Sequence, residues 1–282
     1  MIKRLMVIFL LCIMTSFSFA QPYFDVFSIQ GVITRPTDLI SNKKFDAKTD
    51  FFSAQLNYAK KLYDSSIIAV TLGYDNWQLT ISGGNLDLES GYIPITYVKP
   101  LSQKWKCSFT AISRFSKANG KGLDDKIFQL GGAFIINRKM SDRLLLKGGL
   151  YYNREFFGNY FLPLAGIEWK VNERMHVYGL LPNNFFVDYK LSEQLHTGFI
   201  FKGITASFRL RARNYYDYIR LEEGQLKLFV DYYITKHFVL NIEAGHTVAR
   251  EYGFGFLNKE SNSAEFNDGY LFKAGVYYRL WL

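Results

Sequence analysis

The stretch GYLFKAGVYYRLWL, Gly269 to Leu282, decides the fold of this chain. Every second position in it is apolar: Tyr270, Phe272, Ala274, Val276, Tyr278, Leu280 and Leu282. Alternation with a period of two is typical of a β-strand that has one apolar and one polar face. The stretch finishes on Trp281 and Leu282, whereas soluble domains usually finish in a frayed, hydrophilic tail. We therefore expect a strand whose apolar face meets something other than water.

The same period of two recurs along the chain after residue 22. The apolar sets run over residues 52–58, 68–74, 105–111, 144–152, 161–171, 226–234 and 240–244. Aromatic residues make up 18% of the 282 residues and only 6 are proline, a composition that suits pleated strands. Mean hydropathy is -0.05, so polar and apolar residues must interleave. The sequence therefore predicts an all-β protein with a single domain over residues 21–282.

The one continuous apolar run lies at the start of the chain. Lys3 and Arg4 precede an apolar segment that ends in Ser18-Phe19-Ala20. This order is typical of a secretory signal peptide, so we expect residues 1–20 to be a signal that is cleaved near Ala20. Loss of the two basic residues lowers the formal charge from +9 to +7. The exported chain then has one cysteine, Cys107, which excludes an internal disulfide.

The predicted connections between strands alternate in length. Tight turns are expected at residues 64–65, 102–103, 141–142, 172–173, 192–193 and 235–236. Between them lie longer polar segments at residues 37–50, 82–91, 116–126, 214–224 and 253–268, and two short links at 158–159 and 182–184. Outer-membrane barrels have short periplasmic turns and longer outside loops, whereas a soluble sandwich has no reason to sort its loops in this way.

These patterns predict a single transmembrane, antiparallel, up-and-down β-barrel with the apolar faces outward. Counting from residue 23 gives about 14 strands, with 12 as the alternative because residues 175–181 and 185–191 are short for spanning strands. Breaks in the alternation near Asp75–Trp77 and at Gly203 predict β-bulges. We expect aromatic girdles at both membrane interfaces, formed by Trp105, Tyr151, Tyr152, Trp169, Tyr189, Tyr215, Tyr216, Tyr232, Tyr233, Tyr277, Tyr278 and Trp281.

The last strand also carries a known pattern. Its Lys273-x-Gly275-x-x-Tyr278-x-Leu280 run, followed by Trp281 and Leu282, resembles the C-terminal assembly signal of outer-membrane barrels, although those chains usually finish on Phe or Trp. The chain as a whole resembles the small, functionally uncharacterised outer-membrane β-barrel families of Gram-negative bacteria. The resemblance implies an outer-membrane location and recognition by the barrel-assembly machinery and periplasmic chaperones. It implies no activity.

The phase of the strands places positive charge on the inner face. The basic residues expected there are Lys106, Arg114, Lys147, Lys170, Lys190, Lys202, Arg209, Arg211, Lys227, Lys273 and Arg279. Five acidic residues share that face: Glu155, Glu168, Asp188, Asp231 and Glu243. A water-filled lumen with such an excess would be a porin-like passive channel that favours anions. Alternatively, lumen ion pairs hold closed a structural or binding barrel.

Other kinds of chemistry find little support in the sequence. The four histidines are scattered without metal-ligand spacing, so we expect no metal site and no cofactor. His246 is a candidate base for a lipid-modifying enzyme, but Val248 stands where its strand would need a nucleophile. No nucleic-acid-binding motif is present, and the expected partners are outer-membrane lipids and lipopolysaccharide. The sequence favours a barrel that is not an enzyme, with the transported solute, if any, and the oligomeric state left open.

Overall fold

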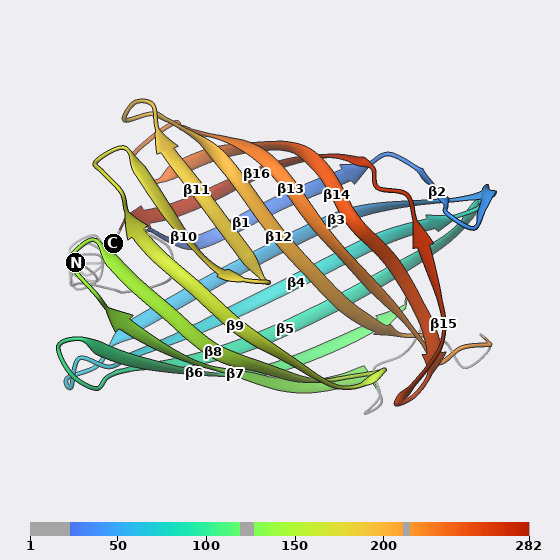
Figure 1. Cartoon of the computed structure of the whole chain (residues 1–282), viewed down its shortest axis with the longest axis horizontal. Coiled ribbons are helices and arrows are strands. Elements are labelled where there is room, and N and C mark those ends of the chain that lie inside the picture. Colours follow the sequence, from blue (N-terminus) through green and yellow to red (C-terminus); the bar gives the residue numbers. More distant parts are fainter. Residues whose placement is uncertain (1–22, 119–126, 211–214, 282) are drawn as a thin grey trace, which may run out of the picture.

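The computed structural model describes residues 23–118, 127–210 and 215–281. These residues form sixteen strands (Figure 1): β1 (Tyr23–Thr34), β2 (Thr37–Leu39), β3 (Asn42–Lys61), β4 (Ile67–Ile81), β5 (Gly84–Pro100), β6 (Trp105–Ala118), β7 (Phe128–Lys139), β8 (Leu144–Glu155), β9 (Gly158–Lys170), β10 (Met175–Leu181), β11 (Asn184–Lys190), β12 (Leu195–Arg209), β13 (Tyr218–Tyr233), β14 (Phe238–Phe256), β15 (Lys259–Phe266) and β16 (Tyr270–Trp281). The described part of the chain contains no helix that is long and apolar enough to cross a membrane.

Fourteen of these strands close into one antiparallel barrel. Each pairs with the next along the chain, with β2 and β15 left out, and β1 closes the ring by pairing with β16 on one side and β3 on the other. The prediction of fourteen strands is therefore confirmed. The six tight turns, and the start of β1, lie together at one end of the barrel (Figure 1). The expected signal peptide, residues 1–20, lies outside the described residues.

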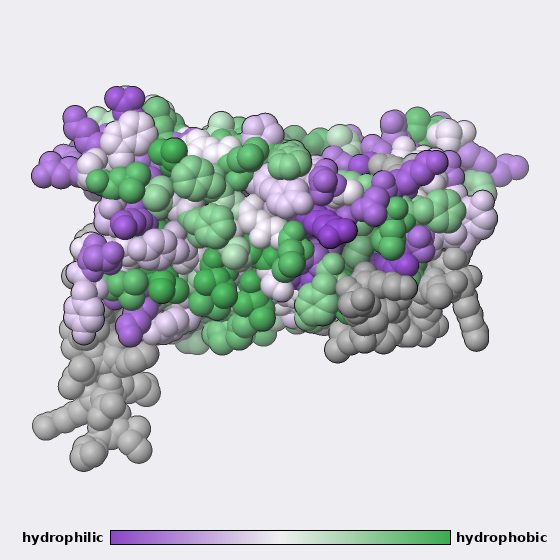
Figure 2. Space-filling model, turned by 90° about the horizontal axis from the view of Figure 1, so that it is seen from below, coloured by the Kyte–Doolittle hydropathy of each residue, from purple (hydrophilic) through white to green (hydrophobic). Residues whose placement is uncertain are grey.

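The outer face of the barrel is apolar over its middle section. Figure 2 shows hydrophobic side chains across this section and hydrophilic ones towards both ends of the barrel. Large apolar residues on the outward phase are exposed on many strands: Phe52, Leu56, Leu72, Ile95, Phe109, Phe134, Leu150, Phe161, Leu228, Ile242 and Phe272. An exposed apolar belt on a closed barrel is the surface that lipid requires. The section with this belt is called the membrane section below.

The long polar loops of the sequence-based prediction are wrong in part, because the strands continue through them. Residues 82–91 form a two-residue turn and the start of β5. Residues 253–268 hold the end of β14 and all of β15, while residues 37–50 hold β2 and the start of β3. Hydrogen bonding to neighbouring strands satisfies the backbone in these segments, although their side-chain pattern is polar on the outside. The strands therefore extend well beyond the apolar belt.

Above the belt, the two faces of the strands exchange character. On β4, Leu72 points outward and is 51% exposed, whereas Leu79 points inward and is 1% exposed. The pairing of β3 with β4 is regular through this region, so the bulge predicted near Asp75–Trp77 does not exist. The register of β12 with β13 is equally regular across Gly203. The breaks in the sequence pattern mark the level at which the apolar side chains change from the outer to the inner face.

At the same level the ring of strands becomes narrower. β7 to β9 end near this level, β10 and β11 end before it, and the free edge of β12 meets that of β6 through a bridge between Arg209 and Lys117. On the other side, β2 and β15 are joined by Leu39 and Phe266 and stand in place of β1 and β16. The result is a ring of nine strands, β2 to β6 and β12 to β15, which we call the head.

The head is filled by an apolar core. Its buried residues come from opposite walls of the barrel: Ala47, Trp77, Leu79, Leu88, Ala118, Phe208, Leu210, Ile219, Leu221, Tyr252 and Phe266. A ring of eight strands has an interior that side chains just fill, and nine strands is close to that limit. The described residues of the head therefore close the lumen at this end.

Candidate functional site

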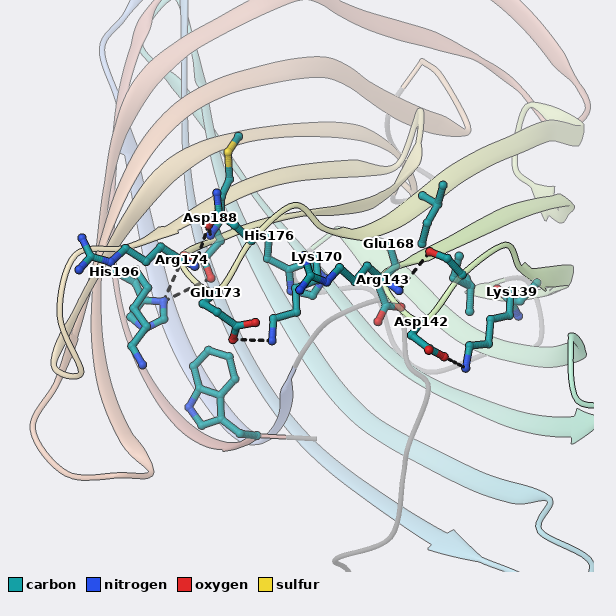
Figure 3. A pocket seen from close by; sticks show the side chains of 18 of the residues that line it. Lys139, Asp142, Arg143, Glu168, Lys170, Glu173, Arg174, His176, Asp188 and His196 are labelled. Atoms are coloured by element: carbon teal, nitrogen blue, oxygen red, sulfur yellow. Dashed lines mark hydrogen bonds and ion pairs between the residues drawn. The ribbon is translucent and has the colours of Figure 1, made fainter.

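A large cavity in the described structure opens at the end with the tight turns. It has a volume of about 810 Å³ and lies between the inner walls of β6 to β12 (Figure 3). Seven cationic side chains line it: Lys104, Lys106, Lys139, Arg143, Lys170, Arg174 and Lys190. Five carboxylates stand against them: Asp142, Glu168, Glu173, Asp188 and Glu193. The cavity, called the vestibule below, therefore has an excess of two positive charges.

The rim of the vestibule is built from three matching ion pairs. Each joins the last lysine of a strand to an acidic residue three positions on, in the tight turn that follows. The pairs are Lys139 with Asp142 (2.6 Å), Lys170 with Glu173 (2.8 Å) and Lys190 with Glu193 (2.6 Å). In each turn a hydrogen bond from the lysine, assisted by its charge, lowers the pKa of the carboxyl. These three carboxyl groups therefore stay ionised. Two arginines, Arg143 and Arg174, also lie at the rim.

The wall of the vestibule carries two buried pairs. Lys147 Nζ on β8 donates to Glu168 on β9 at 3.3 Å. His196 Nδ1 on β12 lies 3.2 Å from Asp188 on β11. Figure 3 shows Asp188 and His196 at one side of the cavity and Glu168 in its middle. The two carboxylates of the wall thus have partners inside the barrel. The lysines and arginines named above line the cavity around them.

The side of the vestibule next to β16 is an aromatic cluster around Arg279. The guanidinium lies 3.5 Å from the centre of the Tyr23 ring and donates to Asp25 and Asp231, each at 2.7 Å. Trp281 packs edge-on to Tyr23 and lines the cavity. The predicted place of Trp281 in an interfacial girdle is therefore wrong, since its ring faces the lumen.

The other rings of the predicted girdle divide between the two faces. Rings exposed on the outer wall are Trp105, Trp169, Tyr189 and Tyr232, and Tyr278 is half-buried on the same face. Tyr233 and Tyr277 are buried on the inner face, and Tyr151 shares the inward phase of β8. Tyr215 and Tyr216 lie in the link before β13, beyond the belt. Strand ends attract aromatic residues on both faces here because the inner ones pack on lumen cations.

Further inside, three lysines meet at mid-lumen. Lys273 Nζ donates to Glu243 Oε1 at 2.6 Å, and Lys227 Nζ forms an ion pair with Glu243 Oε2 at 2.6 Å. Lys202 lines the same small cavity, about 20 Å³ in volume. All three belong to the basic set predicted from strand phase, and the structure places them together.

The remaining predicted basic residues lie apart from this cluster. Arg114 lies over the Tyr92 ring, 5.8 Å from its centre. Arg209 belongs to the head, where Nη1 lies 3.0 Å from Asp217, and the regular register of β12 puts it on the opposite face from Lys202. Arg211 lies outside the described residues. Lys106, Lys170 and Lys190 line the vestibule.

A hydrogen-bonded group lies where the head meets the membrane section. Ser207 on β12 donates to Glu155 at 2.5 Å and accepts from Gln129 Nε2 at 2.9 Å and from the Phe156 backbone at 3.2 Å. These contacts join β12 to β7 and β8 directly, above the turn between β10 and β11. That short hairpin ends about half-way along the barrel (Figure 1).

The described residues show no group of three or more His, Cys, Asp and Glu placed to hold a metal ion. The contacts of His246 are a hydrogen bond with the Thr247 carbonyl at 2.7 Å and the edge of the Tyr270 ring. Of the expected C-terminal signal, Lys273, Gly275, Tyr278, Leu280 and Trp281 lie in β16, between β1 and β14, and Leu282 lies outside the described residues.

Several residues of the vestibule are missing from the sequence-based prediction. Lys104, Arg143 and Arg174 lie in the tight turns, and strand phase does not define where a turn residue points. His196 and Trp281 do share the inward phase of their strands, which is the signal that could have found them. The sequence-based prediction instead places Trp281 in the interfacial girdle and gives no role to His196.

Comparisons with known proteins give one family. A family model described as domain of unknown function DUF6268 matches residues 49–280. No curated protein matches the chain.

Solved structures of similar shape include three outer-membrane proteins. The COG4313 outer membrane channel from Pseudomonas putida F1 has 7% identity and a TM-score of 0.47, over 94% of this chain and 100% of that one. The P. putida toluene transporter TodX has 10% identity and a TM-score of 0.45, over 91% and 89%. The NanC porin has 9% identity and a TM-score of 0.40, over 90% and 100%.

Proposed function

The chain belongs to the DUF6268 family of unknown function, and we propose that it is an outer-membrane barrel that binds small anions in a vestibule facing the periplasm. One arrangement carries the proposal: the lumen is open and basic at the tight-turn end, and the described residues of the head close it at the other. Tight turns lie on the periplasmic side of outer-membrane barrels, which gives the orientation.

The electrostatics of the vestibule support an anionic ligand. Its carboxylates are held by partners on the rim and wall, so an entering anion meets Lys104, Arg143 and Arg174. Low-dielectric walls concentrate the field of such an excess inside a concave site. The Trp281 ring beside His196 offers an apolar surface for the less polar part of a ligand.

The proposal includes the cellular setting. The apolar belt supports insertion among outer-membrane lipids and lipopolysaccharide, and the C-terminal pattern supports recognition by the barrel-assembly machinery and periplasmic chaperones after cleavage of residues 1–20. Heat-modifiable mobility of the purified mature protein on gels tests the membrane assignment. A protein that partitions into the soluble fraction and shows no such shift would overturn it.

Anion binding can be followed through Trp281. Titration of the detergent-solubilised protein with inorganic phosphate or citrate is expected to change tryptophan fluorescence saturably, and less strongly as ionic strength rises. The double variant Lys104→Met, Arg174→Met is expected to weaken binding at least several-fold. Lys60→Met, on the outer face of β3 at the same end, is the matched control. Equal binding by the three proteins would contradict the proposal.

A passive, anion-leaning channel is the second candidate. The observation in its favour is the continuation of positive charge from Lys106 and Lys147 to the three mid-lumen lysines. Planar-bilayer recording separates the two functions. We expect the folded wild-type protein to be silent, because the head closes the lumen. Current steps with anion preference in the wild-type protein would favour the channel.

A further inference from the structure

The small cavity at mid-lumen, between the vestibule and the head, has no role in the proposed function. Its volume of about 20 Å³ is the size of one water molecule or one monatomic ion. Lys202, Lys227, Lys273 and Gln30 line it, together with the rings of Phe51 and Trp77.

The charges around this cavity do not balance. Glu243 divides its two oxygens between Lys227 and Lys273. The carboxylate that lines the cavity, Glu223, is held by Arg250 at 3.4 Å and accepts from Gln225 Nε2 at 2.6 Å. Three lysines therefore share one carboxylate, which leaves two positive charges in excess.

Lys202 is the lysine without a matching carboxylate. Among the described residues its Nζ has neither a hydrogen bond nor an ion pair, and its contact is with the Phe51 ring, 5.8 Å from the centre. Asp75 acts on it only from a distance and accepts a hydrogen bond from Tyr92 at 3.4 Å. An ammonium group enclosed in this way is costly unless a counter-charge is supplied.

Gln30 adds a neutral donor to the same cavity. Its Oε1 accepts from the Tyr277 hydroxyl at 2.8 Å. Its amide N–H groups have no acceptor among the described residues, so they are available to a species in the cavity. The wall thus presents three ammonium groups and an amide, all of them donors.

We propose that this cavity holds a single halide ion, chloride in the cell, bound by Lys202, Lys227, Lys273 and the Gln30 amide. Water would fit the volume but would leave the two excess charges uncompensated. The halide joins β1, β12, β13 and β16 from inside and acts as a structural counter-ion of the membrane section. This site is separate from the vestibule and does not depend on anion binding there.

Anomalous diffraction tests the site directly. Crystals of the full-length mature protein grown in sodium bromide are expected to give an anomalous peak within contact distance of the three lysine Nζ atoms. Crystals of Lys202→Met in the same salt are expected to lack the peak. Well-ordered lysines with no bromide peak between them, or with water alone, would overturn the proposal.

A solution measurement gives an independent answer. In chloride, the wild-type barrel is expected to unfold at a higher temperature than in gluconate of equal ionic strength, by a shift of a few degrees that saturates with chloride. Lys202→Met should lose the difference, and Lys99→Met, exposed on the outer face of β5, should keep it.

Glu243→Gln provides the opposite change. It raises the excess charge around the cavity, so the shift between gluconate and chloride should grow. If Lys202→Met does not fold, Lys202→Gln replaces it. Equal unfolding temperatures of the wild-type protein in chloride and gluconate would exclude the site, as would an equal chloride response in Lys202→Met.

Discussion

The membrane section and the head share strands β3 to β6 and β12 to β14 but are opposite in construction. On β4, Leu72 and Leu79 are seven residues apart and so point to opposite faces, yet one faces outward in the belt and the other lies in the head core. In the membrane section the apolar face is outside and ion pairs fill the lumen. In the head the apolar face is inside and polar residues cover the surface. The surrounding solvent, and not the strand, decides which face is apolar.

The largest expected effect comes from moving a charge between the two faces. Leu79→Lys places an ammonium group in the head core, which should cost several kcal/mol of unfolding free energy. Leu72→Lys in the belt should cost about 2–4 kcal/mol. Thr71→Lys and Thr80→Lys, on the other face of β4 at each level, should be close to neutral. Urea unfolding in lipid vesicles measures the free energy of unfolding of all four variants. An equal cost for Leu79→Lys and Thr80→Lys would contradict the assignment of an apolar inner face to the head.

Removal of apolar volume is expected to separate the two regions next. Leu88→Ala in the head core should lower the free energy of unfolding by about 2–5 kcal/mol, because the side chain is fully buried and leaves a cavity. Leu56→Ala in the belt should cost less, since lipid chains fill the space that it leaves. The same urea unfolding provides the measurement. A larger loss for Leu56→Ala would show that the belt is packed like a protein core.

The junction of the two regions should respond more weakly. Ser207→Ala removes the hydroxyl that links Glu155, Gln129 and the Phe156 backbone, at a cost of about 1–3 kcal/mol. Ser113→Ala, on the outer face of β6, is the matched control. Hydrogen exchange of the β12 edge should increase in the first variant only. No change there would mean that the head does not rely on this contact.

The smallest effect is expected at the vestibule rim. Glu173→Gln breaks the ion pair with Lys170, but both groups are exposed and screened by salt, so the unfolding midpoint at neutral pH should not change measurably. The hydrogen bond from Lys170 lowers the pKa of Glu173 in the folded state. Any contribution of the pair is therefore present above the unfolded-state pKa and is lost as the pH falls through the folded-state pKa. A midpoint that differs between the two proteins at neutral pH would show that this ion pair contributes measurably to the stability of the barrel.

The sequence predicts the barrel well because period two and tight turns are local signals. The number of strands and the outward phase of Phe52, Leu56 and Leu72 follow from them. The head does not follow, since a strand pattern that changes phase at Asp75–Trp77 or Gly203 has two readings, a bulge or an exchange of faces. The regular register of β3 with β4 and of β12 with β13 excludes the bulge, and the distant bridges of Arg209 with Lys117 and of Leu39 with Phe266 close the head.

The mid-lumen cavity and the vestibule likewise could be predicted from the sequence only in part. Lys202, Lys227 and Lys273 share an inward phase that the sequence predicts, but their meeting around one cavity depends on the stagger of β12, β13 and β16. The turn residues Arg143 and Arg174 have no phase at all, so their place at the vestibule mouth comes from the fold. Local pattern gives the face of a residue, and the three-dimensional pairing gives its neighbours.

The cluster around Arg279 has a consequence for how the barrel is sealed. Arg279 and Asp25 are 254 residues apart, and their contact forms only when the last strand meets the first. A slip of β16 by one residue would turn the guanidinium into lipid and take it away from Asp25, Asp231 and Tyr23 at once. Pairing of the last strand with the first in a wrong register therefore loses these contacts at the step that closes the barrel. Arg279 thus favours the native register of the closed barrel.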